Sequence, residues 1–414
     1  MASERFSAAS SALRRAEEQL GQPWTLGGSL VPVLSQHRAA ALDLSAAGVD
    51  ELATVSNALA TIDPETLGIT AGRLDLAAVG ALAEPFGQVD RALDRMATVV
   101  TAADSPWLVT PVADELASLS SRIADNAPKV DNAVAAVDLA PTMLGADGPA
   151  VYLVLFTSPA EARGLGGFIG NYAELTVTNG QLELTEFGRV SDLEAQAQAM
   201  QARVAGPDDF LARYGRFGFD NDGNGAVGNA AFRNLTMTPH FPWVGDVATQ
   251  LYTQVTGRSV NGVIAMDAYV VQALLAYTGP IELSQFDVQL TSENAADYIV
   301  REQYELGADD NLQRIDALEE AAELTTNALL SGSLPEPTQL ARDLGPLAAE
   351  RRLLMWAADP EQQDLLRRVG LLGEIPPLDG GDGWSVAVTN ASGNKIENYL
   401  ERAFSYSAQT DDEG

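Results

Sequence analysis

Five arginines in the middle of the chain are the residues best suited to chemistry in a protein with few bases. The chain has 25 lysines and arginines against 57 aspartates and glutamates, and its only lysines are Lys129 and Lys395. The five arginines are Arg163, Arg189, Arg233, Arg301 and Arg314. A planar guanidinium group suits bidentate binding of phosphate. The alternative for each arginine is a surface salt bridge with one of the abundant acids.

A glycine-rich stretch, "GLGGFIG", follows Arg163 and comes soon after an apolar run. It does not have the order of a dinucleotide-binding loop, because a strand rather than a helix is expected after it. It also lacks the Gly-Lys-Ser/Thr of a P-loop. Its glycines permit positive φ angles and close approach of the backbone. We therefore include Gly166, Gly167 and Gly170 with Arg163 as candidate residues beneath a phosphate-binding cleft.

Two further polar positions allow more than one interpretation. "DNDGNGAVGNAA" places Asp220, Asp222 and Asn224 at alternate positions, as at the start of a calcium loop. The twelfth position of such a loop needs a bidentate glutamate, and here it is Ala231. The stretch is either a plain polar turn or a calcium site completed by a distant acid. His240, between prolines and aromatics, is more typical of a packed loop histidine than of a catalytic base.

The composition excludes several classes of function. A formal net charge of −32 repels DNA, RNA and anionic lipid headgroups at long range, so we expect no nucleic-acid partner. The absence of cysteine excludes disulfides, thiolate metal sites and thiol catalysis. No apolar run reaches the roughly 18–20 residues that cross a bilayer, and the N-terminus lacks the pattern of a signal peptide. The sequence predicts a soluble chain, to which a membrane anchor outside these residues could be joined.

The N-terminal part, residues 1–145, is predicted to be a helical bundle or stalk. Apolar residues recur there at a spacing of three to four, which places each set on one face of a helix. One such stripe runs from Leu82 to Val100, and another runs from Val112 to Val137. Pro128 should kink or interrupt the longest helix. We expect this region to serve as a stalk or as a surface for partners.

The middle part, residues 146–335, is predicted to alternate strands with helices, which indicates an α/β or α+β domain. Val151 to Phe156 and Val260 to Met266 have the continuous apolar character of buried strands. Between them, two alternating runs meet at Asn179-Gly180, the strongest short-range signal for a hairpin. Helices are expected after Asp267, from Thr291 or Ser292 to Tyr304, and from about Asp310 to Leu330.

The C-terminal part, residues 336–406, is predicted to return to helices, with Leu353, Leu354 and Trp356 in the core. After these helices, "GWSVAVTN" and "KIENYLERAFSYS" have the character of two strands joined by a polar loop. Such a hairpin would complete the preceding domain. The acidic end of the chain, residues 407–414, is expected to be disordered.

Several of these stretches resemble domain-of-unknown-function family 4012, a family of bacterial cell-envelope proteins. "YLVLFTSPAEARGLGGFIGNYAELTVTNGQL" is similar to its signature of apolar strand, glycine crossing and hairpin. "NLTMTPHFP", "VNGVIAMDAYVVQALLAYTGPIEL" and "SGNKIENYLERAFSY" are also similar, so the resemblance covers about residues 25–406. His240 departs from the family's pattern, where an aspartate is expected, and the usual N-terminal membrane helix is not in this chain. The resemblance implies the extracytoplasmic part of a membrane-anchored envelope protein.

The family in turn resembles, more distantly, the LytR-CpsA-Psr proteins. Those proteins transfer glycopolymers from polyprenyl-pyrophosphate carriers to the cell wall, using arginines, an acid and magnesium. "GRVSD" stands where they carry an Arg-Asp pair, and "ADYIVREQYELGADDNLQRID" resembles their tyrosine–arginine segment. The resemblance implies Asp192 and Arg301 as catalytic residues and Asp310 as a Mg²⁺ ligand. It also implies three phosphate-binding residues besides Arg163 and the glycines: Arg189, Gln303 and Arg314. Gln303 is near the position at which the relatives carry a second arginine in the tyrosine–arginine segment. Further along, the relatives carry a pair of arginines, and this chain has only Arg314.

Two functions are therefore expected, both on a fold of N-terminal helices followed by a LytR-CpsA-Psr-like mixed β-sheet flanked by helices. The first is an extracytoplasmic protein that binds or transfers a polyprenyl-(pyro)phosphate-linked glycan, the transfer making it a glycopolymer phosphotransferase. The second is a non-catalytic envelope scaffold, or a lipid- or sugar-binding module, with protein partners on its N-terminal helices. Transfer requires the arginines at 163, 189, 301 and 314 to converge on one pocket with an apolar floor for an isoprenoid tail. Guanidinium groups on different faces, each paired with a surface acid, would contradict transfer.

Overall fold

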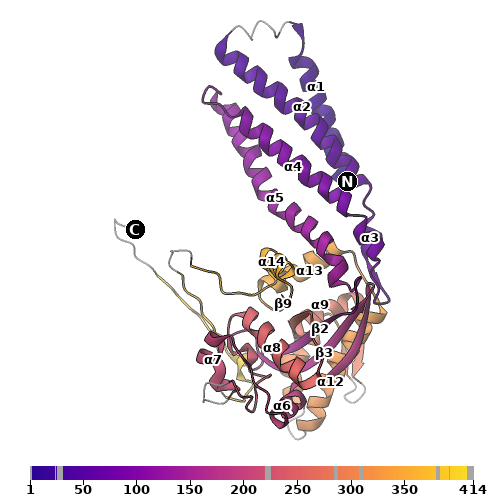
Figure 1. The fold of residues 1–414 in the computed structure, drawn as a ribbon, viewed down its shortest axis with the longest axis vertical. Coiled ribbons are helices and arrows are strands. Elements are labelled where there is room, and N and C mark those ends of the chain that lie inside the picture. The colour runs from indigo at the N-terminus through magenta and orange to yellow at the C-terminus, as the bar shows by residue number, and fades with distance from the viewer. Residues whose placement is uncertain are drawn as a thin grey trace.

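The computed structural model describes residues 2–23, 25, 31–219, 225–283, 288–306, 311–378, 383–390 and 392–407. The side chains at positions 2, 32, 65, 305, 306 and 311–319 lie outside this description. Figure 1 shows an elongated molecule in which a set of long helices stands on a mixed α+β body. The predicted combination of an N-terminal helical region with a mixed sheet flanked by helices is confirmed at this level.

Four long helices build the N-terminal region. Helix α1 (Ala2–Leu20) packs on α2 (Pro32–Ala60), α2 packs on α4 (Ala83–Ala103), and α4 packs on α5 (Thr110–Met143) (Figure 1). The short elements β1 (Ile69–Thr70) and α3 (Leu76–Gly80) lie between α2 and α4. Helix α5 continues through Pro128, so the predicted interruption does not occur. Buried residues on both sides of that proline, Ile123 and Val137, hold the helix against the rest of the molecule.

A five-stranded mixed sheet forms the body, with the strand order β4-β3-β2-β5-β9. Strand β2 (Ala150–Ser158) pairs antiparallel with β3 (Phe168–Thr178), and β3 pairs antiparallel with β4 (Gln181–Arg189). On its other side β2 pairs in parallel with β5 (Gly262–Asp267), which confirms both predicted buried strands. The predicted hairpin is also confirmed. Asn179 and Gly180 have φ angles of 49° and 77°, the two positive values that a type I′ turn requires.

Helices cover both faces of this sheet, which is why the central strands are apolar on both sides. Helices α6 (Val190–Ala199) and α8 (Phe241–Thr256) pack on one face, where Leu153 and Leu155 of β2 are fully buried. Helices α9 (Ala268–Thr278) and α12 (Asn311–Ser331) pack on the other face. The predicted helix ending near Tyr304 is present as three consecutive pieces: α10 (Ala295–Asp297), a π-helical turn (Tyr298–Glu302) and α11 (Gln303–Leu306).

The helical region is joined to the sheet through the end of α5 and the β3–β4 turn. The hydroxyl group of Tyr152 donates a hydrogen bond of 2.7 Å to the backbone carbonyl of Met143, in the last turn of α5. The backbone N–H of Gly180 donates to the carbonyl of Leu144 at 2.9 Å. These bonds satisfy carbonyls that a helix end leaves without an internal partner. No helix within the described ranges is long and apolar enough to cross a membrane.

Two predictions for the C-terminal part are wrong. Leu353–Ala357 is not helical but forms β9, a strand at the edge of the sheet, between α13 (Pro337–Ala349) and α14 (Pro360–Arg368). A run of five apolar residues has no helical period, and here its backbone pairs antiparallel with β5. The expected C-terminal hairpin is also not formed, since 383–390 and 392–407 contain no strand. No sheet covers their alternating apolar residues, and Trp384 and Phe404 are 53% and 58% exposed.

Candidate functional site

The loop between β2 and β3 is shaped by its glycines. Gly166 has a φ of +70°, a conformation that side chains with a Cβ rarely adopt. At Gly167 a Cβ atom would lie 1.8 Å from the backbone carbonyl oxygen of Ser158, so only glycine allows this approach. Thr236 holds the crossing in place, because its hydroxyl group donates to the Gly167 carbonyl at 2.6 Å. The glycines therefore fold the chain back directly onto the end of β2.

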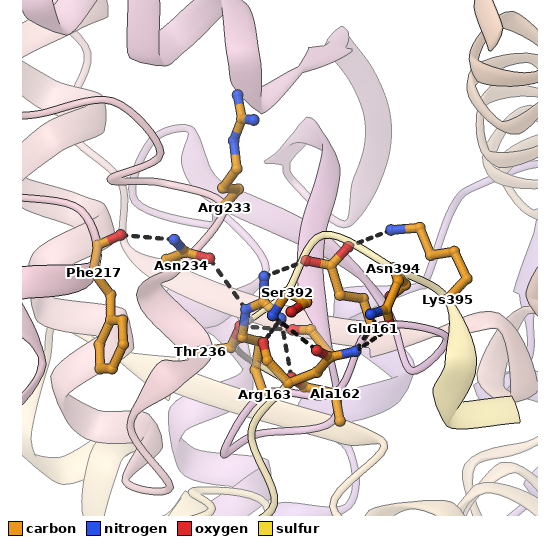
Figure 2. Close-up of polar contacts among 12 residues, drawn as sticks. Glu161, Ala162, Arg163, Phe217, Arg233, Asn234, Thr236, Ser392, Asn394 and Lys395 are labelled. Carbon is orange, nitrogen blue, oxygen red and sulfur yellow. Dashed lines mark hydrogen bonds and ion pairs between the residues drawn. The ribbon is translucent and has the colours of Figure 1, made fainter. Parts of the chain in front are cut away.

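Arg163, at the start of this loop, is buried and fully engaged in holding the fold together. Only 7% of its surface is exposed. Its guanidinium group forms an ion pair with Glu161 and donates to the side-chain oxygen of Asn234 at 3.1 Å and to the backbone carbonyl of Asn390 at 2.9 Å. Figure 2 shows these contacts gathered around one side chain. The arginine thus joins three segments of the chain and does not present its charge to a ligand.

Glu161 links the loop to the C-terminal segment. One carboxylate oxygen accepts from Arg163 and the other accepts from the ammonium group of Lys395 (Figure 2). Burial alone would raise the pKa of Glu161. The hydrogen bonds from Lys395 and Arg163 outweigh this effect and lower the pKa below its ordinary value. Glu161 is therefore ionised at neutral pH, and the ammonium group of Lys395 also lies 4.0 Å from the centroid of the Phe168 ring.

Beside this network lies a pocket of about 390 Å³ that is rich in basic residues. Three cationic residues line it: Arg189, Arg233 and Lys395. Glu161 is the only acidic residue among its lining residues that the structure describes. Phe168, Ile169 and Tyr304 supply apolar and aromatic surface, and Gly170, Asn171 and Ser191 complete most of the wall. In a chain with a net charge of −32, this local excess of positive charge is the feature that singles out the pocket.

Each cation reaches the pocket from a different element. Arg189 is the last residue of β4 and the N-cap of α6, and it is paired in register with Asn171 of β3. Arg233, in the loop before α8, forms an ion pair with the buried Glu194 of α6. In Figure 2 the Arg233 side chain extends away from the Glu161 network. Lys395 belongs to the C-terminal segment that Arg163 anchors. The pocket therefore exists only when strand, loop and C-terminal segment are assembled.

A small apolar hollow of about 60 Å³ adjoins the cationic pocket. The two cavities share Phe168, Gly170 and Asn171 in their walls. The amide nitrogen Nδ2 of Asn171 is buried and has no hydrogen-bond partner, and neither does the hydroxyl group of Ser158, which lines the hollow. Buried polar groups are normally satisfied, so unpaired ones indicate a missing partner. At Asn171 the missing partner is an acceptor, because the unpaired atom is a donor.

Comparison with known proteins agrees with the family suggested by the sequence. Residues 147–304 match the model of the family described as Protein of unknown function (DUF4012). The match is confined to this segment, which is therefore similar to that family. No curated protein and no solved structure matches the chain. The matched segment holds β2 to β5 and the loops that present Arg189 and Arg233, whereas β9 and Lys395 lie beyond it.

The structure brings together only part of the site predicted from the sequence. Arg189 and Gly170 line the pocket. Gly166, Gly167 and Arg163 lie behind it, in the framework of the loop. Asp192 is on the exposed surface of α6 and does not line the pocket.

The candidates from the tyrosine–arginine segment do not converge on the pocket either. Arg301 forms an ion pair with Asp297 one turn earlier, at 39% side-chain exposure. Gln303 is buried, with its Oε1 atom unpaired, and is not among the lining residues, although the next residue, Tyr304, is. Arg314 lies in α12, but its side chain is outside the described part of the chain, and so is Asp310. The predicted convergence of four arginines is thus not found among the side chains that the structure describes.

Two functional candidates were not assigned a role by the sequence. Lys395 lies more than 200 positions from Glu161 in the chain, and its rarity as a lysine was the one available signal. Asn171 is an ordinary polar residue in a strand, and only its burial without a partner draws attention to it. Arg233 was noted as a base, but nothing in its local sequence connected it to the glycine loop.

Metal binding finds no support among the described residues. They contain no group of three or more histidine, aspartate or glutamate side chains that could hold a metal ion. The donor set does not fit Mg²⁺, which prefers carboxylates and phosphate oxygens, because the one acid of the pocket is already paired with two cations. The calcium-like stretch at Asp220, Asp222 and Asn224 lies outside the described residues.

Proposed function

We propose that this protein binds the phosphate-bearing group of an anionic ligand in the pocket lined by Arg189, Arg233 and Lys395. The observation that carries this proposal is that three cationic side chains line one concave site in which Glu161 is the one acid among the described lining residues, while Arg233 also pairs with the buried Glu194 outside that lining. Guanidinium groups bind phosphate oxygens in bidentate fashion, and a pocket with partly apolar walls strengthens such contacts. Asn171 also lines this pocket, and its amide nitrogen is a buried donor without a partner in the free protein.

The single acid of the pocket does not oppose this binding. Glu161 is held by Arg163 through one carboxylate oxygen and by Lys395 through the other. Arg163 remains in place because its other donors are bound to the protein framework. Lys395 can therefore turn from Glu161 to a ligand phosphate without leaving a buried carboxylate unpaired, which would be costly. Of the two cations at Glu161, Arg163 thus holds the carboxylate in place and Lys395 binds the ligand.

The resemblance to LytR-CpsA-Psr proteins suggests the class of ligand, a polyprenyl-(pyro)phosphate-linked glycan in the cell envelope. The geometry supports the phosphate end of such a molecule. Tyr304 and Phe168 offer aromatic surface for the group next to the phosphate. The adjoining hollow of about 60 Å³ holds only a short piece of an isoprenoid chain, so the rest of the chain would lie outside it. The proposal is limited to binding, because Asp192 and Arg301 lie away from the pocket. We also propose, from the resemblance alone, that the protein works outside the cytoplasm.

Isothermal titration of the full chain with inorganic pyrophosphate and with farnesyl diphosphate tests the proposal. We expect both to bind once per chain, with affinity that falls as salt is added. Arg189→Gln should weaken binding about tenfold or more, as expected when a hydrogen bond to a charged group is lost. Arg301→Gln is the matched control, since Arg301 lies outside the pocket, and it should leave the affinity unchanged. Equal affinities for the unaltered chain and Arg189→Gln would overturn the assignment of this pocket.

A further inference from the structure

A second and larger pocket lies far from the first, in the N-terminal helical region. Its volume is about 770 Å³, and it lies mainly between α2 and α5. Leu34, Ala41 and Leu44 of α2 face Val112, Leu116 and Leu119 of α5 across it. On α5 the apolar positions lie four and three residues apart and form one continuous apolar face. On α2 they lie seven and three residues apart, with the polar His37 and Arg38 between Leu34 and Ala41. Most ligand sites in proteins fall between roughly 300 and 1,000 Å³ and are predominantly apolar, as this one is.

The two helices that line this pocket both pack on α4. Leu116 belongs to a buried cluster with Val100 and Ala103 of α4, so α4 supports both helices from below. His37 is also among the lining residues. Its Nδ1 atom donates to the carbonyl of Val33 at 2.7 Å, and its Nε2 atom accepts from the backbone N–H of Val109 at 2.8 Å. The pocket is thus an open groove in the helical region, with Leu34 54% and Val112 40% exposed, and these contacts form without a ligand.

Two arginines stand among the lining residues of this apolar pocket. Arg38 donates to the hydroxyl oxygen of Thr25 at 3.3 Å and to the carbonyl of Leu20 at 3.2 Å, which are both neutral acceptors. Arg122 lies on the α5 side and is exposed. Within the described ranges no carboxylate forms an ion pair with either arginine, although acids outnumber bases more than twofold in this chain. Glu115 is the one acid among the lining residues that the structure describes, and it bonds to neither arginine.

We infer that this pocket binds a single-chain anionic amphiphile, with its hydrocarbon chain between α2 and α5 and its head group at Arg38 and Arg122. Burial of the chain removes apolar surface of both ligand and pocket from water, which contributes about 25 cal/mol per Å². The two guanidinium groups complement a carboxylate or a phosphate head group. This site is independent of the phosphate pocket proposed above, because it shares no residue with that pocket.

Fluorescence titration of the full chain with dansyl-undecanoic acid tests the inference. We expect saturable binding of one probe per chain, with the blue shift that an apolar environment causes. Ala41→Trp fills the cavity and should abolish binding, whereas Ala39→Trp, on an exposed part of the same helix, should not. Arg122→Glu should weaken binding about tenfold or more, and Arg14→Glu, an identical charge change on α1, should leave it unchanged. Thermal unfolding of each variant confirms that it is folded.

Competition experiments identify the head group. Palmitate and dodecyl phosphate should each displace the probe, and the one that does so at lower concentration shows whether a carboxylate or a phosphate is preferred. Dodecyl maltoside, which has an uncharged head group, should displace it at least about tenfold less well. Equal displacement by all three would contradict an anionic head-group site. Unchanged probe binding in folded Ala41→Trp would show that the probe does not enter this pocket, and the inference would be abandoned. Arg189→Gln should bind the probe normally, which separates this site from the phosphate pocket.

Discussion

Arg163 donates a hydrogen bond of 2.9 Å from its guanidinium group to the backbone carbonyl of Asn390, a residue 227 positions further along the chain. This contact brings the C-terminal segment across the glycine loop and places Lys395 beside Glu161. An arginine that could have been a ligand for phosphate instead positions a lysine that lines the pocket. The relation explains why the C-terminal segment contributes to the site although it adds no strand to the sheet.

The pair formed by Glu161 and Arg163 should be important for stability. Glu161→Gln leaves the buried Arg163 without its carboxylate, and we expect the free energy of unfolding to fall by about 3–5 kcal/mol. Asp297→Asn is the control, because it breaks an ion pair of similar geometry whose partners are 39% and 47% exposed, and it should cost at most about 1 kcal/mol. Urea unfolding of both variants measures the difference. Similar small losses in both would show that the buried pair is not a structural anchor.

Two glycines of the loop should respond differently to the same substitution. Gly167→Ala places a Cβ atom against the Ser158 carbonyl, so we expect a loss of about 1–3 kcal/mol or more in unfolding free energy. At Gly170 a Cβ atom would meet only the Phe168 ring, at 3.7 Å, so Gly170→Ala should change stability by no more than about 0.5 kcal/mol. Because Gly170 lines the phosphate pocket, the second variant should instead reduce pyrophosphate affinity. Chemical unfolding and calorimetric titration together separate these effects.

His240 should make the stability depend on pH below neutrality. Its Nδ1 atom accepts from the backbone N–H of Ile375 at 3.0 Å, which requires the neutral ring. Burial lowers the pKa of His240; Glu374 opposes this effect, and Arg351 adds to it. Below the ordinary pKa of 6.5 the unfolded chain therefore binds a proton that the folded chain does not, and stability falls as pH falls.

The measurement for His240 is the unfolding free energy at about pH 7.5 and at about pH 5.5. The unaltered chain should lose more stability between these values than His240→Gln, whose side chain keeps an acceptor for Ile375 but does not titrate. An equal loss in both proteins would show that the proton is taken up elsewhere.

Asn171 offers a test that rests on the proposed phosphate site. Its Nδ2 atom is buried and unpaired in the free protein, so Asn171→Leu should not destabilise the fold by the amount that a lost hydrogen bond would cost. The same variant should bind pyrophosphate more weakly, and Asn171→Asp, which adds a negative charge to the pocket, should abolish binding. A folded Asn171→Asp with unchanged affinity would place the ligand elsewhere. Calorimetric titration measures the pyrophosphate affinity of each variant, and urea unfolding measures its stability.

The sequence predicted correctly those parts of the fold that depend on interactions between residues near one another in the chain. The Asn179-Gly180 turn has one favourable geometry for two alternating strands, and it forms as expected. The apolar runs of β2 and β5 are continuous because helices cover both faces of the sheet, and this pattern is visible in the sequence alone. The apolar stripes of α4 and α5 have the helical period. Pro128 does not interrupt α5 as one form of the prediction had it, because the buried residues on both sides of the proline hold the helix in place.

Predictions failed where the local pattern suits more than one environment. The run Leu353–Ala357 has no period of its own, and the open edge of β5 makes it a strand. The alternating residues after position 383 suit a strand as well, but an isolated pair of strands is marginal without a covering surface. Here 383–390 and 392–407 form no strand, Ile396–Tyr399 is a short 3-10 helix, and Trp384 and Phe404 stay exposed. Whether each of these two stretches becomes a strand depends on whether another strand lies close to it in space. A short stretch of sequence does not contain that information.

By itself, the sequence determined the class of the fold, the position of the hairpin and the scarcity of positive charge in an acidic chain. Only the tertiary structure decided which bases meet. Arg163 forms a buried ion pair with Glu161, and Arg301 forms an exposed ion pair with Asp297. Three other bases line one pocket: Arg189 from a strand, Arg233 from a loop and Lys395 from the distant C-terminal segment. The reason is physical. Turns and periodicity arise from neighbouring residues, whereas a site made of distant residues arises from the packing of the whole chain.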